Sequence, residues 1–100
     1  MKYSVYILKC SDGSYYTGVT NYLKRRVQEH IDGINPTCYT YKRRPLELVY
    51  YEHYEFIEDA IMREKQIQKW SRKKKEALIN NDEAALKQLA KNRTQYPLTK

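Results

Sequence analysis

Residues 3–30 read YSVYILKCSDGSYYTGVTNYLKRRVQEH, and this stretch organises the rest of the chain. From residue 3 to residue 8, one set of side chains (Tyr3, Val5 and Ile7) alternates with another (Ser4, Tyr6 and Leu8). This alternation is typical of a strand with two distinct faces. The segment Ser11–Ser14 contains Asp-Gly, a strong hairpin signal between two β-forming runs. A second short strand is expected from Tyr15 to Val19. These residues together predict an antiparallel hairpin.

An amphipathic helix is expected directly after the hairpin. Thr20 and Asn21 are good N-cap residues, and Gly33 is a suitable residue for the helix to end at. Arg26 and His30 are four residues apart, so they lie on the same side of the helix, along one edge of its apolar stripe. The stripe consists of Leu23, Val27, Ile31 and Ile34, and the residues expected to face solvent are Lys24, Arg25 and Glu29.

Residues 35–45 are expected to form a loop that combines two tyrosines with three consecutive basic residues. Its basic residues are Lys42, Arg43 and Arg44. Aromatic rings mixed with cations are what a nucleic-acid backbone and unstacked bases favour, so these three are candidate nucleic-acid contacts. The alternative is a loop held in place by tyrosine packing.

A third strand is expected at Leu46–Glu52, followed by a second helix that begins at Phe56 or Ile57. The apolar stripe of this helix contains Phe56, Ile57, Ala60, Ile61, Ile67 and Trp70. Glu64 falls within that stripe, where a lone ionised carboxylate is costly. It therefore calls for a basic residue, backbone donors or a cation, and a structural salt bridge is the ordinary expectation.

The last third of the chain is strongly basic. Residues 63–75 contain seven basic residues and one acid, so Arg72, Lys73 and Lys74 are candidate nucleic-acid contacts. A solvated lysine face is the alternative. Ser71 would cap a third helix, Arg72–Asn80.

Asp82 would cap a last helix, Glu83–Lys91, and residues 92–100 have the composition of a loose tail. We expect residues 1–80 to form one domain and residues 81–100 to form this short helix and flexible tail.

Composition narrows the class of protein. The chain has 100 residues, a net charge of +7 and 31% charged residues, and this charge favours a polyanionic partner over a merely solvated surface only weakly. No apolar run approaches the roughly 20 residues that span a bilayer, and no signal peptide is evident. We therefore expect a cytoplasmic protein without membrane contact. Cys10 and Cys38 give no disulfide framework and too few ligands for a structural zinc site.

The hairpin and helix resemble the GIY-YIG nuclease superfamily. Ser4-Val5-Tyr6 and Tyr16-Thr17-Gly18 are similar to the two halves of its signature. Arg26 and His30 follow Tyr16 by ten and fourteen residues, as the catalytic arginine and the next His or Tyr do in the family. Glu64 corresponds to the glutamate that binds the metal. The resemblance covers roughly residues 2–80 and is strongest to small, stand-alone bacterial members.

The resemblance implies a small α/β sandwich of the α+β type, with a three-stranded antiparallel sheet flanked by helices. It implies a DNA endonuclease with a single Mg²⁺ or Mn²⁺ ion held by Glu64. Arg26 would hold the scissile phosphate. Tyr6 or Tyr16 would be the general base or would position water, with a phenol pKa lowered by Arg26 and the metal. His30 would bind the phosphate or relay a proton.

The sequence departs from the family pattern at a few positions. Ser4 replaces the first glycine, and Thr17 replaces an isoleucine by another β-branched residue. Val19 stands where some members carry a lysine. The late asparagine of the family has only Asn80 and Asn81 as candidates. No core catalytic residue type is lost, so activity is expected.

Two further functions compete with the nuclease. The chain has no room for a separate DNA-reading domain, so a nuclease would select branched, flapped or nicked substrates, in repair or recombination, or depend on a protein partner. RNA stays open as a substrate. The second hypothesis is a non-catalytic nucleic-acid-binding module with a decayed site, and the third is a protein-interaction adaptor.

Overall fold

The protein is described here from a computed structural model, which describes residues 2–82 and 86. The elements are β1 (Tyr3–Lys9), β2 (Tyr15–Thr20), α1 (Leu23–Asp32), a short 3₁₀ helix η1 (Tyr41–Arg43), β3 (Glu47–Tyr54), α2 (Ile57–Gln68) and α3 (Arg72–Ile79). The chain divides into two compact units, Met1–Lys69 and Trp70–Lys100. The helix expected at Glu83–Lys91 falls almost wholly outside the described residues, as does the tail. The domain boundary at residue 80 stays a prediction.

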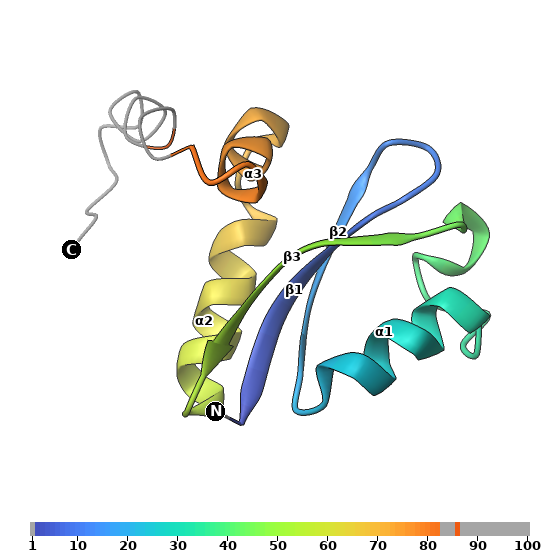
Figure 1. Ribbon diagram of the computed structural model, residues 1–100, viewed down its shortest axis with the longest axis horizontal. Coiled ribbons are helices and arrows are strands. Elements are labelled where there is room, and N and C mark those ends of the chain that lie inside the picture. The colour runs from blue at the N-terminus through green and yellow to red at the C-terminus, as the bar shows by residue number, and fades with distance from the viewer. Residues whose placement is uncertain (1, 83–85, 87–100) are drawn as a thin grey trace. The chain divides into compact units, whose positions relative to one another are not determined.

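The first unit contains a three-stranded antiparallel sheet in the order β2-β1-β3. Tyr6 on the central strand pairs with Gly18 of β2 and Tyr51 of β3, so these three residues share one face. That face contacts α1, and the opposite face packs against α2 (Figure 1). The expected fold class, a three-stranded antiparallel sheet flanked by helices, is confirmed.

The core of the first unit is built around β1, because a helix covers each face of the sheet. Val5, Tyr6, Ile7 and Leu8 are all fully buried. Successive side chains of a strand point to opposite faces of the sheet, but all of them are buried when both faces are covered. Ile67 of α2 is likewise fully buried.

The hairpin turn forms as the sequence predicts. Asp12 Oδ1 accepts hydrogen bonds from the Ser14 amide, at 3.0 Å, and from the Ser14 hydroxyl, at 2.6 Å. Gly13 has φ of 85°, in the left-handed region that glycine tolerates at no steric cost. The Cys10 amide donates to the Ser14 carbonyl at 2.8 Å, which closes the turn.

The start of α1 differs from the prediction. The N-cap residue is Tyr22, which makes no side-chain capping bond. Thr20 and Asn21 are therefore not the caps: the Thr20 hydroxyl accepts the Tyr22 amide at 3.1 Å, within the turn that precedes the helix. The helix ends as expected, at Gly33 with φ of 68°.

The buried side of α1 also differs from the prediction. Ile31 and Ile34 were expected in the buried stripe, but their exposed fractions are 43% and 66%, whereas His30 is only 8% exposed. The reason is chemical: His30 finds a hydrogen-bond partner on the sheet, so its burial leaves no polar group unsatisfied.

The bounds of β3 and α2 are close to those expected. β3 runs two residues beyond the predicted end, and α2 begins at Ile57, one of the two predicted starts. Phe56 was expected in the apolar stripe, but it is the N-cap residue and is 67% exposed. Trp70 was expected in the same stripe, but α2 ends at Gln68.

A charged cluster joins β3 to α2. The Arg63 Nε atom donates to Glu52 at 2.8 Å, and the hydroxyls of Tyr50 and Tyr54 donate to the same carboxylate. Burial alone would raise the pKa of Glu52, but these donors outweigh it and hold the pKa below its ordinary value. The sequence pattern gave no sign of this ion pair.

The second unit contains α3. The Ser71 hydroxyl accepts the Lys74 amide at 3.2 Å, so the predicted cap of this helix is confirmed. The Lys74 ammonium lies 4.3 Å from the centre of the Trp70 ring, a cation–π contact. None of the helices in the described part of the chain has the length and apolar character that crossing a membrane requires.

Two buried threonines of β2 should respond oppositely to replacement by valine. The Thr17 hydroxyl is buried and has no hydrogen-bond partner among the described residues, so Thr17→Val should raise the free energy of unfolding by about 1 kcal/mol. Thr20→Val is the matched control, because it loses a hydroxyl that is bonded to Tyr22, and it should be destabilising. Chemical denaturation measures both. A lower free energy of unfolding for Thr17→Val would contradict this reading.

Gly18 is required because the Tyr6 ring lies against its Cα. A Cβ at residue 18 would be 2.5 Å from the Tyr6 hydroxyl oxygen and 2.6 Å from its Cζ. Gly18→Ala should therefore cost about 1–3 kcal/mol of unfolding free energy through overpacking. In a Tyr6→Leu background the same substitution should cost close to nothing, which a double-mutant cycle by denaturation would measure. Equal costs in the two backgrounds would rule out this contact as the cause.

Candidate active site

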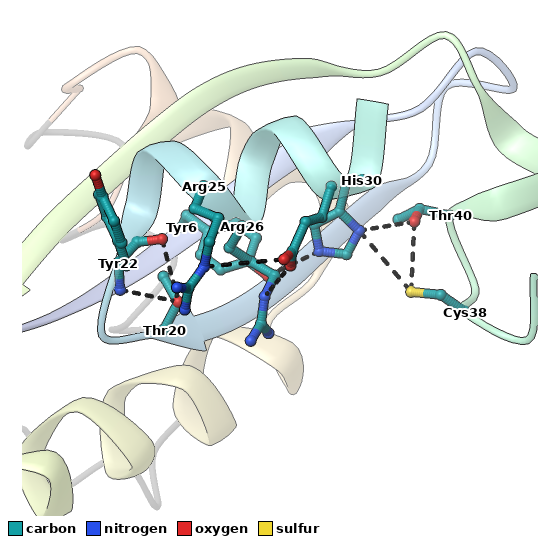
Figure 2. Close-up of polar contacts among 9 residues, drawn as sticks. Tyr6, Thr20, Tyr22, Arg25, Arg26, His30, Cys38 and Thr40 are labelled. Carbon is teal, nitrogen blue, oxygen red and sulfur yellow. Dashed lines mark hydrogen bonds and ion pairs between the residues drawn. The ribbon is translucent and has the colours of Figure 1, made fainter. Parts of the chain in front are cut away.

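Tyr6 and His30 form the centre of the candidate site. The Tyr6 hydroxyl and the His30 Nε2 atom are 2.9 Å apart, and His30 Nδ1 is 2.9 Å from the Thr40 hydroxyl. Figure 2 shows Thr40 and Cys38 together on one side of the His30 ring. The Thr40 hydroxyl donates to Cys38 Sγ at 3.4 Å, so its oxygen is left to accept the proton on Nδ1. Nε2 then accepts the Tyr6 proton, which fixes the neutral tautomer of His30.

Tyr16 is brought to the same place by the strand register. Residues 6, 16 and 18 share one face of the hairpin. The Tyr16 ring centre is 5.2 Å from that of His30 and 6.3 Å from that of Tyr6. The Tyr39 ring stacks on the Tyr16 ring, with 6.2 Å between the ring centres. Tyr16 is half-buried, whereas Tyr6 is fully buried, so Tyr16 is the tyrosine that can reach a ligand.

A pocket of about 360 Å³ opens beside these rings, between α1 and the loop that follows it. Tyr16, Arg26, Glu29 and His30 line one part of it. Glu29 was expected to face solvent only, but its carboxylate accepts a hydrogen bond from Arg26 Nε at 3.2 Å. The guanidinium is thereby held at the pocket, one helical turn before His30.

The pKa values of Tyr6, Tyr16 and His30 are each shifted toward the neutral form of the side chain. Burial raises the pKa of Tyr6, with a further rise from Tyr16, and burial also raises the pKa of Tyr16. Burial, then the charge of Arg26, lowers the pKa of His30. Arg26 lowers the pKa of both phenols, as expected, but burial outweighs this effect, so the net pKa of each phenol is raised in the protein alone.

Glu64 lies on α2, beside the edge strand β2. Its Oε2 atom accepts a hydrogen bond from Gln68 Nε2 at 3.1 Å, and the same nitrogen donates to the Thr17 carbonyl at 3.3 Å. The Glu64 carboxylate is close enough to Tyr16 to contribute to the raised pKa of that phenol, after burial and Cys38. The structure thus brings Glu64 to the strand that carries Tyr16.

The expected structural salt bridge of Glu64 is not found in the part of the chain that the structure describes. Within residues 2–82, no basic side chain pairs with this carboxylate, because its neighbour Arg63 pairs with Glu52 instead. Glu64 is half-buried rather than fully buried, so water can still reach it. A half-exposed carboxylate with an open oxygen fits Mg²⁺, which keeps most of its waters and needs few protein ligands. In the described part of the chain no three acidic, His or Cys residues cluster as a fuller metal site.

The loop residues expected to bind nucleic acid have contacts of their own. Arg43 forms an ion pair with Asp12 at 3.1 Å and lies over the Tyr39 ring at 3.8 Å. Arg44 lies over the Tyr41 ring at 4.6 Å. Lys42 is exposed. Arg43 therefore supports the tyrosine that stacks on Tyr16, and nucleic-acid contact by these three residues stays a prediction.

The three basic residues of α3 belong to the second unit. Arg72 pairs with Glu76 at 3.2 Å, Lys74 contacts Trp70, and Lys73 is exposed. Nucleic-acid contact by these residues also stays a prediction.

Sequence reasoning missed three residues that organise the site: Thr40, Glu29 and Gln68. Thr40 fixes the tautomer of His30, yet it lies in a loop without periodicity. Gln68 carries a weak signal, because it lies one helical turn after Glu64 and can therefore reach it.

Comparison with known proteins identifies the family of this chain. A family model described as the GIY-YIG catalytic domain matches residues 2–77. UPF0213 proteins of Staphylococcus aureus are 48% identical over 75 residues, which is 75% of this chain and 90% of theirs.

Two structures solved by NMR share the fold. One is a UPF0213 protein of Bacillus halodurans, 39% identical, with a TM-score of 0.54 and coverage of 82% of this chain and 86% of that one. The other, from E. faecalis, is 35% identical, with a TM-score of 0.57 and coverage of 81% and 85%. The matched range contains the hairpin, both helices of the first unit and every candidate site residue from Tyr6 to Glu64. The chain therefore belongs to the GIY-YIG nuclease family.

Proposed function

We propose that the protein is a metal-dependent endonuclease that hydrolyses phosphodiester bonds in DNA. The observation that carries this proposal is one pocket lined by Tyr16, Arg26 and His30. The Glu64 carboxylate, which forms no ion pair within residues 2–82, lies beside the strand that carries Tyr16. The substrate that we propose is branched, flapped or nicked DNA. Repair or recombination is the process that such an activity would serve.

Arg26 is the residue proposed to hold the scissile phosphate. Its guanidinium is at the pocket and presents several N–H donors to phosphoryl oxygens. The ion pair with Glu29 orients it before substrate binds. A fixed positive charge stabilises the charge that develops on the phosphoryl oxygens in the transition state.

Tyr16 is the phenol proposed to orient the attacking water, because it lines the pocket and is half-exposed. Tyr6 lies beneath it and holds His30 through its hydroxyl. Glu64 would hold a single Mg²⁺ or Mn²⁺ ion, whose chemistry there is to neutralise phosphoryl charge, assist the leaving oxygen and offset the negative charge beside Tyr16. With Glu64 neutralised in this way, Arg26 acts on the phenol unopposed by that carboxylate.

Substitution of Glu64 tests the function directly. Glu64→Gln should lower cleavage by about a hundredfold or more, because the charge that holds the ion is lost. Glu58→Gln, an exposed acid in the first turn of the same helix, should leave the rate unchanged. The measurement is cleavage of labelled single-stranded, duplex, flap, nicked and four-way DNA, and of matched RNA, with Mg²⁺, with Mn²⁺ and with chelator.

Equal cleavage by Glu64→Gln and the unaltered protein would contradict this proposal. Binding of the same substrates without cleavage, unaffected by chelator and weakened steeply by salt, would favour the non-catalytic module instead.

The cleavage rate should also depend on the charge of His30. A histidine with a lowered pKa stays neutral to a pH below its ordinary value of 6.5 and then gains a proton. Protonated Nε2 can no longer accept the Tyr6 proton, so the rate should fall on acidification with a midpoint below pH 6.5. In His30→Gln this acid limb should disappear, since glutamine does not titrate. Rate–pH profiles measure it, with circular dichroism at each pH as the control for unfolding. A midpoint above 6.5 would contradict the assignment.

A further inference from the structure

Gln68 makes two hydrogen bonds with one nitrogen. It is the last residue of α2, one turn after Glu64. Its Nε2 atom donates to Glu64 Oε2 at 3.1 Å and to the Thr17 carbonyl at 3.3 Å. An amide nitrogen carries two hydrogens, so both bonds can form at the same time. One side chain thus connects the Glu64 carboxylate to the backbone of β2.

The choice of Thr17 as the second acceptor matters for geometry. Thr17 is fixed by its pairing with Ile7 of the central strand, and its chain neighbours are Tyr16 and Gly18. Through Gln68, the Glu64 carboxylate is therefore held in place relative to the strand that carries Tyr16. A flexible glutamate on a helix would otherwise sample several rotamers.

We propose that Gln68 is a positioning residue that orients the Glu64 carboxylate to hold a divalent cation next to Tyr16. This inference rests on the proposed function, because it assumes that Glu64 is the metal ligand. Gln68 occupies one carboxylate oxygen, and within residues 2–82 no other group bonds to the carboxylate, so the second oxygen is open to a cation. Such outer partners of a ligand fix its orientation and raise its affinity for the metal.

If Gln68 only stabilised its helix, Gln68→Met and Gln28→Met should affect Mn²⁺ binding equally. Gln68 is exposed, and exposed side-chain pairs at this spacing add little to the stability of a helix. The chain offers a matched control on α1, where Gln28 donates to Asp32 at 3.0 Å with the same four-residue separation. Gln28→Met removes an exposed glutamine and its bond to Asp32, whereas Gln68→Met removes an exposed glutamine and its bonds to Glu64 and to the Thr17 carbonyl.

The test is a titration of ¹⁵N-labelled protein with Mn²⁺, without nucleic acid. Paramagnetic broadening of the Glu64 and Thr17 amide signals reports the ion at this site. Gln68→Met should need about tenfold more Mn²⁺ for the same broadening. Gln28→Met should match the unaltered protein, and all three melting temperatures should agree. In cleavage assays Gln68→Met should raise the half-saturating Mg²⁺ concentration by a similar factor. At saturating Mg²⁺ its cleavage rate should equal that of the unaltered protein.

The outcomes separate this inference from the proposed function. If the unaltered protein binds Mn²⁺ at Glu64 and Gln68→Met binds it equally well, the positioning role is wrong and the nuclease proposal stands. If no broadening centres on Glu64 in the unaltered protein, both the metal site and the role of Gln68 are overturned. A weaker Mn²⁺ response in Gln28→Met as well would show a general effect of helix stability and would also overturn the inference.

Discussion

The hydrogen bond between Tyr6 and His30 is the interaction on which the rest of the site depends. It connects the central strand to α1 and allows a histidine to be buried on a helix face where an isoleucine was expected. A buried imidazole is stable only if both its nitrogens are satisfied, and Thr40 satisfies the second. Because Arg26 precedes His30 by one turn, the rotation that buries His30 also sets Arg26 at the pocket.

Two consecutive charged residues of α2, Arg63 and Glu64, lie in different surroundings. On the α2 face, Glu52 takes the guanidinium of Arg63 and the hydroxyls of two tyrosines, so this ion pair is fully satisfied within the fold. Glu64, the next residue along α2, is left without a cation among the described side chains. Adjacent residues on a helix point about 100° apart, which is why one can belong to the interior and the other to the strand edge. Because Arg63 is used in this pair, the carboxylate that we propose as the metal ligand has no ion pair among the described residues.

Local signals in the sequence predicted local structure well. The Asp-Gly turn, the helix end at Gly33 and the strand alternation depend on neighbouring residues and were confirmed. The errors concern the N-cap of α1, which is Tyr22 rather than Thr20 or Asn21, and the burial of apolar residues. Ile31 is exposed because His30 has a partner 24 residues earlier in the chain, and Phe56 is exposed because it lies just before the helix rather than within it. The site tyrosines, arginine, histidine and glutamate were identified by spacing and family resemblance, whereas Thr40 became visible only when the loop was placed on α1.

The contact between Tyr6 and Gly18 has a consequence for how such a protein can evolve. The tyrosine ring fills the space above Gly18 of the edge strand β2, so it is part of the packed interior as well as the support of His30. Catalytic and binding residues often lie on loops, whose sequences can change while the scaffold stays intact. Here a change at either position alters the interior and the pocket together. Lineages of this fold are therefore expected to diversify through the loop and the helix ends, while this pair of residues varies only jointly.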